Sequence, residues 1–390
     1  MHTKSIRNLV LWTLIVLMIS ASYALAVPIT GGSSQRQSSG GAYDDNEVPY
    51  GKSPTTGLDF TGIYQPVMVQ ISNATGARPH WNLSEADIVY EAIIWGPGHT
   101  RYTAVYNDSH PAFVGPIRSI RLHNAQLRQE WDCPLVFWGG QSMAGTSVKE
   151  FFKTQNVPES ILFDGTGGFG KAVADITARS SGQYARIAPH NAYGNLEALL
   201  SEYYPADYTS RNHAFQFTDI PAMGFDSAAE IAISYGNDYN PSYTYNAAAQ
   251  VYERSYNGEP EYDGYTNERI VASNVIVQRT KHTYYNGIAS RPLIETTGEG
   301  EAEIFIGGRH IRGKWMRKNL NDRTVFVDAT GVEIQLLPGK TFIQIISNTL
   351  DFTYTRDDGA KITVSYDKAI SDMEAIELTD TDAAELDKVE

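Results

Sequence analysis

The stretch ADIVYEAIIWGPGHTRYTAVYN, residues 86–107, decides how the first half of the chain folds. Two runs rich in Val, Ile, Ala, Tyr and Thr, residues 86–95 and 101–107, are typical of β-strands. Residues 96–99 (GPGH) lie between them, and glycine and proline between two such runs favour a tight connection. The sequence therefore predicts a β-hairpin at this point.

Strands and helices alternate on both sides of the hairpin. The expected strands are PVMVQIS (66–72) and PLVFWGG (134–140), and the expected helices are RLHNAQLRQEW (121–131), SMAGTSVKEFFKTQ (142–155, with Ser142 as N-cap) and NLEALLSEYY (195–204). Such alternation predicts an α/β domain, to which we assign residues 60–205, with order beginning near Tyr64.

The character of the sequence changes after a polar connection at residues 205–228. Short runs rich in Thr, Val, Ile and Tyr follow, separated by turn residues: EIAISYG, AQVYERSY, NVIVQRT, EAEIFIGG, TVFVDAT, VEIQLLPG and TFIQIIS. They predict a smaller, mostly antiparallel β domain over residues 229–352. The fold class is thus α/β followed by β, or α+β for the chain as a whole, and 390 residues suffice for two domains with separate cores.

The two ends of the chain have their own composition. Residues 1–26 combine Lys4 and Arg7 with an apolar run and a small-residue cleavage site at 24–26, which predicts a signal peptide and an extracytoplasmic location. An uncleaved membrane anchor stays open as the alternative, although the apolar run is short for a span of about 20 residues. Residues 27–59 predict a flexible linker, and the acidic residues 367–390 a mobile tail or one loosely docked helix.

Cysteine content bears on export and on chemistry. Cys133 is the one cysteine, so the chain has no internal disulfide, and no cysteine near residue 26 could carry a lipid. Because Cys133 opens the apolar run CPLVFW, we expect it to be a buried hydrophobic side chain rather than a nucleophile.

Charge excludes one class of function and suggests another. The formal net charge of −14 argues against a general nucleic-acid binder, which needs a basic face. Against that background, GPIRSIRLHN (115–124) places Arg118 and Arg121 on either side of Ser119. Guanidinium groups bind phosphate and carboxylate in a bidentate manner, so we expect an anion site. Both arginines reach one ligand only if a regular strand breaks between them.

Other polar residues lie at expected strand ends and loops. They are Glu91, Thr100, Arg101, His190 and Asn191, and we expect them to form one cleft with Arg118, Ser119 and Arg121. There His190 is the candidate acid or base, and Glu91 orients an arginine or acts as a base. A structural ion pair between Glu91 and Arg101 on adjacent strands, and turn-capping roles for His190 and Asn191, are the alternatives.

Several motifs together resemble the YerB-like (DUF3048) family of exported bacterial proteins. They are RPHWNLSEADIVYEAIIWGPGHTRYTAVY, VGPIRSIR and APHNAY in the first domain, and NVIVQ, GEGEAEIFIGGRHIRGKWMRK and LLPGKTFIQII in the second, together spanning about residues 60–350. The eight polar candidates match these motifs. The resemblance implies an exported two-domain protein but no reaction, because the family is uncharacterised. The chain departs from the family in lacking a lipid-attachment cysteine and in having Glu261, where we expect a histidine, before Asp263.

Other motifs carry less. GTGGFGK (165–171) lacks the Ser or Thr that a nucleotide P-loop needs, and Ser119 is not in a G-x-S-x-G elbow. The histidines show no metal-binding spacing, so we expect no metal and no cofactor. Trp315 with Arg312, Lys314, Arg317 and Lys318 predicts a basic aromatic patch for a sugar or anionic polymer, or a charged strand edge.

Three functions remain open from the sequence. The first is an envelope protein that binds an anionic ligand or glycan through its arginines. The second is a phosphotransferase or phosphodiesterase acting on an envelope glycolipid, in loose resemblance to the LytR-CpsA-Psr phosphotransferases at the level of fold only. The third is a structural module with an envelope protein partner. Membrane contact is expected only through an uncleaved N-terminal segment, and whether the protein is an enzyme stays undecided.

Overall fold

The computed structural model describes residues 48–96, 98–206, 210, 214–220 and 224–367. The expected signal peptide, residues 27–47 of the expected linker, and the tail from residue 368 lie outside this described part. Within it, no helix is both long enough and apolar enough to cross a membrane.

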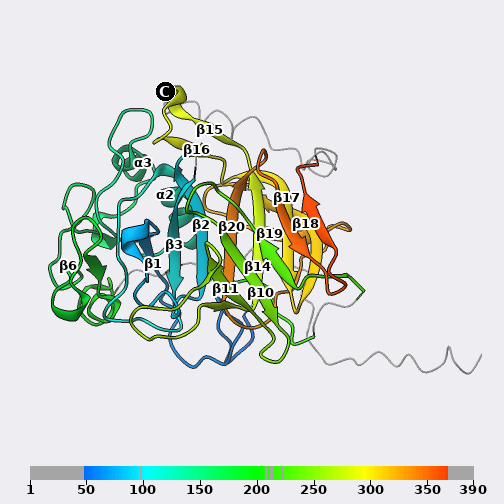
Figure 1. Cartoon of the computed structure of the whole chain (residues 1–390). Helices are drawn as coiled ribbons and strands as arrows, with labels where there is room; N and C mark the ends of the chain where they lie inside the picture. The colour runs from blue at the N-terminus through cyan, green and yellow to red at the C-terminus, as the bar shows by residue number, and fades with distance from the viewer. Residues whose placement is uncertain (1–47, 97, 207–209, 211–213, 221–223, 368–390) are drawn as a thin grey trace, which may run out of the picture. The chain divides into compact units, whose positions relative to one another are not determined.

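A mixed eleven-stranded sheet runs through the described part of the chain (Figure 1). Its order is β19-β18-β17-β14-β20-β2-β3-β1-β4-β5, with β8 paired to β18. The bounds are β1 Val67–Ser72, β2 Ile88–Trp95, β3 His99–Tyr106, β4 Leu135–Phe137, β5 Leu162–Asp164, β8 Asp226–Ser227, β14 Asn274–Thr280, β17 Gly298–Ile306, β18 Arg309–Arg317, β19 Val325–Asp328 and β20 Thr341–Ser347.

The predicted hairpin is confirmed, because β2 and β3 pair antiparallel across residues 96–98. Its register places Tyr90 opposite Thr103 and Glu91 opposite Tyr102. The register shifts nearer the turn, between Ile93 and Trp95. Because successive side chains on a strand point to opposite faces, Tyr90 and Glu91 lie on opposite faces of the sheet.

Strand β20 joins the two halves of the chain. It comes from the second half, yet it lies between β14 and β2 and is parallel to both. The fold class is confirmed, with an α/β first half and a β-rich second half, but the expectation of separate cores is wrong. One buried hydrophobic cluster contains residues from both halves, because β20 pairs with β14 on one side and β2 on the other and so places the side chains of both halves in one sheet.

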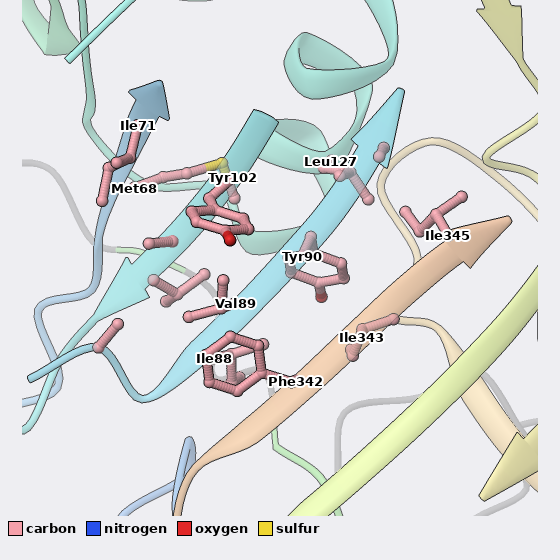
Figure 2. Close-up of a cluster of buried hydrophobic side chains, with 14 of the residues drawn as sticks. Met68, Ile71, Ile88, Val89, Tyr90, Tyr102, Leu127, Phe342, Ile343 and Ile345 are labelled. Carbon is pink, nitrogen blue, oxygen red and sulfur yellow. The ribbon is translucent and has the colours of Figure 1, made fainter. Parts of the chain in front are cut away.

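Helices cover one face of the sheet. They are α2 Leu122–Trp131, α3 Val148–Thr154 and the short α4 Leu196–Ala198, which continues as a π-helical turn, Leu199–Tyr203. Tyr90 lies on this face and accepts a hydrogen bond on its hydroxyl from Trp131 Nε1 at 2.9 Å. Figure 2 shows Tyr90, Ile343 and Leu127 in one cluster of buried side chains.

A seven-stranded sheet covers part of the other face, because Tyr243 on its β10 packs against Phe342 of β20. Its strands are β9 Glu230–Ala232, β10 Pro241–Asn246, β11 Val251–Tyr256, β12 Glu259–Pro260, β13 Val271–Ala272, β21 Phe352–Thr355 and β22 Lys361–Val364. Two small hairpins complete the described strands, β6 Thr177–Arg179 with β7 Ala192–Gly194, and β15 His282–Tyr284 with β16 Pro292–Ile294.

Some local expectations need correction. Helix α3 begins after Ser147, whose Oγ accepts a hydrogen bond from Glu150 N at 3.3 Å, so Ser147 rather than Ser142 is the N-cap. VEIQLLPG forms only isolated bridges, not a strand. Cys133 is fully buried as expected, and burial raises the pKa of its thiol to about 12, which keeps it unreactive.

The last part of the expected linker is folded. Ser53 Oγ and Thr56 Oγ1 each donate to the carboxylate of Asp108 at 2.6 Å, and Thr55 Oγ1 donates to Asp87 at 2.8 Å. All three hydroxyl residues are buried. The Ser/Thr-rich composition of this segment predicted a linker. Its carboxylate partners, after β3 and before β2, are too far along the chain to be recognised from the local sequence.

Candidate functional site: an arginine cluster at the sheet edge

Residues 115–121 cross the ends of two parallel strands. Arg118 N donates to Gln70 O near the end of β1, and Trp138 N, just after β4, donates to Arg118 O. Arg101 is the third residue of β3 and pairs with Ser72, the last residue of β1. The structure therefore brings Arg101 and Arg118 to the carboxyl ends of β1 and β4, the position where open α/β sheets commonly bind ligands.

The chain between Arg118 and Arg121 does not form a regular strand. Ile117 and Ile120 make only isolated bridges, to Ile71 and Gly140, and α2 begins directly after Arg121. The two guanidinium groups are close enough that the charge of Arg118 lowers the pKa of Arg121, after burial, which is the larger cause. The break that both arginines need in order to reach one ligand is therefore present.

Arg101 is the most buried of the three, with 6% of its surface exposed. Its guanidinium donates to the carbonyl of Ser119, and Ser119 Oγ lies 3.4 Å away. Its Nε has no hydrogen-bond partner among the described residues. Burial, followed by the charges of Arg121 and Arg118, lowers the pKa of Arg101 well below its usual range, so its surroundings oppose its positive charge.

The cluster lacks compensating negative charge. In the part of the chain that the structure describes, no Asp or Glu forms an ion pair with Arg101, Arg118 or Arg121. The first turn of α2 carries no acidic residue either. Its N-terminus adds the positive end of a helix dipole to the same place. Buried charges are normally paired, so this cluster differs from the other buried arginines of the protein.

Asn124 fixes the start of α2 against the sheet. Its Oδ1 accepts a hydrogen bond from Arg121 N at 2.8 Å, and its Nδ2 donates to Thr103 Oγ1 at 3.0 Å. Thr103 is two residues after Arg101 and shares its face of β3. The helix start and the buried arginine are thereby held together.

His190 lies beside the cluster. Its imidazole packs against Gly76, where a Cβ would lie 2.9 Å from the ring Cδ2. Burial, and then the charges of Arg118, Arg186 and Arg101, lower its pKa, and its Nδ1 has no partner among the described residues. His190 therefore lies within electrostatic range of Arg118 and Arg101.

Two further arginines near the cluster were missed from the sequence. Arg179 Nη1 donates to Asn191 Oδ1 at 2.6 Å, and its charge contributes to lowering the pKa of Arg118. Arg186 stacks over Trp81 at 4.2 Å and donates to two backbone carbonyls. Asn191 thus holds an arginine rather than a turn. The one signal in the sequence is that both arginines lie in the polar stretch leading to His190.

Glu91 and Thr100 do not belong to this site, which corrects the expected single cleft. Glu91 shares a face with Tyr102, whereas Arg101 shares the opposite face with Ala92, so Glu91 and Arg101 cannot pair. Thr100 Oγ1 instead donates to Glu91 Oε1 at 2.6 Å. Both residues are buried on the side of the sheet covered by the second sheet.

Glu91 is the centre of a buried polar network. Its Oε2 pairs with Arg254 at 2.8 Å and accepts from Gln344 Nε2 at 3.2 Å. Arg254 also pairs with Glu261, the residue at which the chain departs from the family. Asp263 accepts hydrogen bonds from the backbone N–H groups of Asn82, Ser84, Tyr265 and Thr266. These partners give Glu91, Glu261 and Asp263 structural roles.

The aromatic residue of the expected basic patch is not on the surface, although Arg312 is exposed. Trp315 is 1% exposed, and its Nε1 donates to Arg279 O at 2.6 Å. Arg317 is fully buried and pairs with Glu130, while Arg312 and Lys314 pair with acids of β17. The alternation of basic residues along β18 serves cross-strand pairing instead.

The glycine-rich loop at residues 165–171 surrounds a carboxylate. The N–H groups of Gly139, Thr166, Gly168 and Phe169 all donate to Asp164, at 2.6 to 3.0 Å. These donors are directed at a residue of the protein itself, so the loop does not provide a phosphate cradle.

Two open grooves lie elsewhere, near the seven-stranded sheet. The larger, about 540 Å³, is lined by residues of β9, β10, β21 and the adjoining loops, including Glu230, Asp238 and Asp351, and the smaller, about 380 Å³, lies beside His310 and Arg312. The first lining includes no Arg, Lys or His, and Arg312 in the second is already paired with Glu301. Across the described residues, no group of three or more His, Cys, Asp or Glu could hold a metal.

Comparisons with known proteins agree with the sequence motifs. The model of the "Protein of unknown function (DUF3048) N-terminal domain" matches residues 55–209, and that of the C-terminal domain matches residues 231–343. "Putative lipoprotein YerB" of Bacillus subtilis (strain 168) is 26% identical over 318 residues, covering 79% of this chain and 90% of the relative. The crystal structure of the Bacillus subtilis YerB protein matches with a TM-score of 0.62 and 26% identity, covering 76% of this chain and 96% of that one.

Proposed function

We propose that this chain, which belongs to the DUF3048 family of proteins of unknown function, binds an anionic ligand through Arg101, Arg118 and Arg121. One observation carries the proposal. Three guanidinium groups lie at one end of parallel strands, partly or fully buried, and no carboxylate among the described residues compensates them. A ligand bearing phosphate or carboxylate would supply the missing charge.

The ligand is expected in the cell envelope. The relative from Bacillus subtilis is named a lipoprotein, and the first 26 residues of this chain have the pattern of a signal peptide. A phosphate- or carboxylate-bearing glycan or glycolipid of the envelope combines the required charge with the required location. The lipid anchor itself does not transfer, because no cysteine lies near residue 26.

Thermal stabilisation by anions tests the proposal. We expect phosphate, pyrophosphate and phosphorylated envelope glycans to raise the melting temperature of residues 27–390, because a ligand that binds only the folded state stabilises it. The Arg118→Ala/Arg121→Ala variant should lose this shift, since each charged hydrogen bond contributes about 1.5–3 kcal/mol.

The matched control is Arg309→Ala/Arg356→Ala, which removes the same charge from two half-buried arginines in the second half of the chain. It should keep the anion response. Equal stabilisation of both double variants would contradict the proposal, because the effect would then depend on net charge alone.

His190 supports a second candidate, phosphoryl transfer or phosphodiester cleavage on an envelope glycolipid. The specific observation is that burial, and then the charges of neighbouring guanidinium groups, lower the pKa of His190, which leaves a neutral imidazole able to accept a proton at neutral pH. Turnover of a phosphodiester substrate that vanishes in His190→Ala, with binding retained, is the expected result. Binding without turnover in the wild type would leave the protein a binder.

The third candidate, a structural module with internal arginine ion pairs, has less support. It requires carboxylate partners for Arg118 and Arg121, and the described residues provide none in ion-pair contact. A protein partner for the second half of the chain stays a separate expectation.

A further inference from the structure

Two histidines near the arginine cluster, His123 buried and His282 half-buried, have buried ring nitrogens without hydrogen-bond partners among the described residues. His123 is the second residue of α2 and is 1% exposed, and His282 is the first residue of β15. Among the described residues, neither ring nitrogen of either histidine has a partner. These two histidines thus contribute four buried ring nitrogens without a partner among the described residues, and such atoms are rare in protein interiors.

The two histidines are neighbours. The β15–β16 hairpin contacts α2 through β16, and Thr296 Oγ1, just beyond that hairpin, donates to Gln126 Oε1 at 3.1 Å. The charge of His282, and then those of Arg121 and Arg101, contribute after burial to lowering the pKa of His123. His123 therefore lies within electrostatic range of the guanidinium groups that we assign to the anion.

The charged groups around the pair can be named for each element. Arg121 comes from the start of α2, Arg101 from β3, and His282 from β15. Next to His282, Lys281 and Glu295 form an exposed pair at 3.1 Å and compensate each other. The charges of Arg121 and Arg101 are not compensated by a carboxylate among the described residues, so they would repel a metal cation and favour an anion.

We propose that the arginine cluster binds a phosphate-type oxyanion of double negative charge together with one proton, which the His123–His282 pair takes up. The inference rests on the proposed function and specifies its ligand class. Three guanidinium groups and a helix N-terminus provide more positive charge than one carboxylate can compensate. The proton comes from solvent and binds to an imidazole nitrogen that has no other partner, so no other reactant is needed.

The direction of the pH effect follows from the free protein. Burial lowers the pKa of His282 to about 4, and that of His123 lies well below its usual range, so both are neutral near pH 7. A bound dianion stabilises the protonated imidazole and raises the pKa. Between the free and bound values, binding takes up a proton, and affinity rises as pH falls.

Calorimetry with inorganic sulfate measures this uptake directly. Sulfate does not titrate near neutral pH, so any proton taken up belongs to the protein. Titrations of residues 27–390 at about pH 6, in two buffers with different ionisation enthalpies, should show uptake of up to one proton per sulfate. Acetate should bind at least about tenfold more weakly, since it carries a single charge.

Histidine variants locate the proton. His123→Gln and His282→Gln should each bind sulfate with clearly reduced uptake, and His110→Gln, which alters a histidine bonded to Gln65 O, should leave uptake unchanged. If His123→Gln does not fold, His282→Gln on the half-buried hairpin position decides.

The outcomes separate the two proposals. Sulfate binding without proton uptake in the wild type, or uptake unaffected by both histidine variants, overturns the present inference and leaves the anion site standing. Failure of sulfate and phosphate to bind at all overturns the anion site as well. Further titrations, with free phosphate and with a phosphorylated glycan or lipid headgroup, then distinguish which molecule carries the bound phosphate group.

Discussion

Arg101 carries a charge that the fold does not neutralise, in contrast to the other deeply buried arginines. Arg254 pairs with Glu91 and Glu261, and Arg279 with Glu301. Arg101 has a backbone carbonyl and the Ser119 hydroxyl instead. A buried cation that has only neutral acceptors lowers the stability of the fold, and such destabilising groups are commonly found at binding sites.

This contrast predicts that two matched substitutions change stability by different amounts. Arg101→Met replaces an unpaired buried cation with an apolar side chain, so the free energy of unfolding should change by no more than about 1 kcal/mol, in either direction. Arg254→Met leaves Glu91 buried without its cation and should cost about 3–5 kcal/mol. Urea denaturation of both variants, without added anion, measures the difference. Equal losses would mean that Arg101 has a structural partner after all.

The residue types of the site could be predicted from the sequence, but their grouping could not. Arg118, Arg121 and Arg101 were expected together and lie together, since Arg101 is near the start of β3 beside the end of β1, and residues 118–121 cross the ends of β1 and β4. Glu91 and Thr100 were assigned to the same cleft wrongly. The face on which Glu91 lies depends on the register of the hairpin and on the irregularity between Ile93 and Trp95, which no local pattern shows.

At the scale of elements, the segment before β1 is fastened to β2 and β3 by buried carboxylates. Asp87 Oδ2 accepts hydrogen bonds from Thr55 Oγ1 and Asn107 N, both at 2.8 Å. Burial, and then the nearby charge of Asp108, raise the pKa of Asp87 to about 7. This junction should therefore respond to pH.

Asp87 predicts a loss of stability with rising pH. Because the pKa of Asp87 is higher in the folded state than the usual 3.8 of an exposed aspartate, the folded protein holds the proton more tightly than the unfolded chain. The contribution to the free energy of unfolding is complete below about pH 4 and is lost as pH rises to about 7, by at most about 1.4 kcal/mol per pH unit. Asp87→Asn should remove that slope from the pH dependence of urea midpoints. An unchanged slope would show that another group is responsible.

Elements with a clear local pattern were predicted well. The hairpin strands, β1, and the helix at residues 122–131 follow from periodicity and composition. The N-cap of α3 and the folding of residues 53–57 were not predicted. A serine or threonine is equally common in a helix cap, a turn or a linker, and the sequence does not show its hydrogen-bond partner.

At the scale of the whole molecule, β20 makes the two halves interdependent. This strand pairs with β14 and β2 at once, and Asp263 from the second half accepts N–H groups of Asn82 and Ser84 from the first. Sequence patterns showed two regions of different composition but not which strands would pair. A buried strand is a hydrophobic run whose sequence does not indicate which strand lies next to it.

The shared sheet predicts that neither half folds alone. Residues 48–215 expressed by themselves would expose the edge of β2 and the apolar side chains that β20 covers. We expect aggregation, or no cooperative thermal transition, from this fragment, and one transition from residues 27–390 in scanning calorimetry. A separately cooperative fragment would contradict the single core.

The central claim is that Arg101, Arg118 and Arg121 hold an anion, and the most direct measurement is the crystal structure of this protein soaked in tungstate. Tungstate is a tetrahedral dianion, and its anomalous scattering locates it without reference to the protein coordinates. The account predicts the strongest peak between the three guanidinium groups, at the carboxyl ends of β1 and β4 and beside the start of α2. It would be contradicted by tungstate bound only elsewhere, with carboxylates of the protein paired to these three arginines.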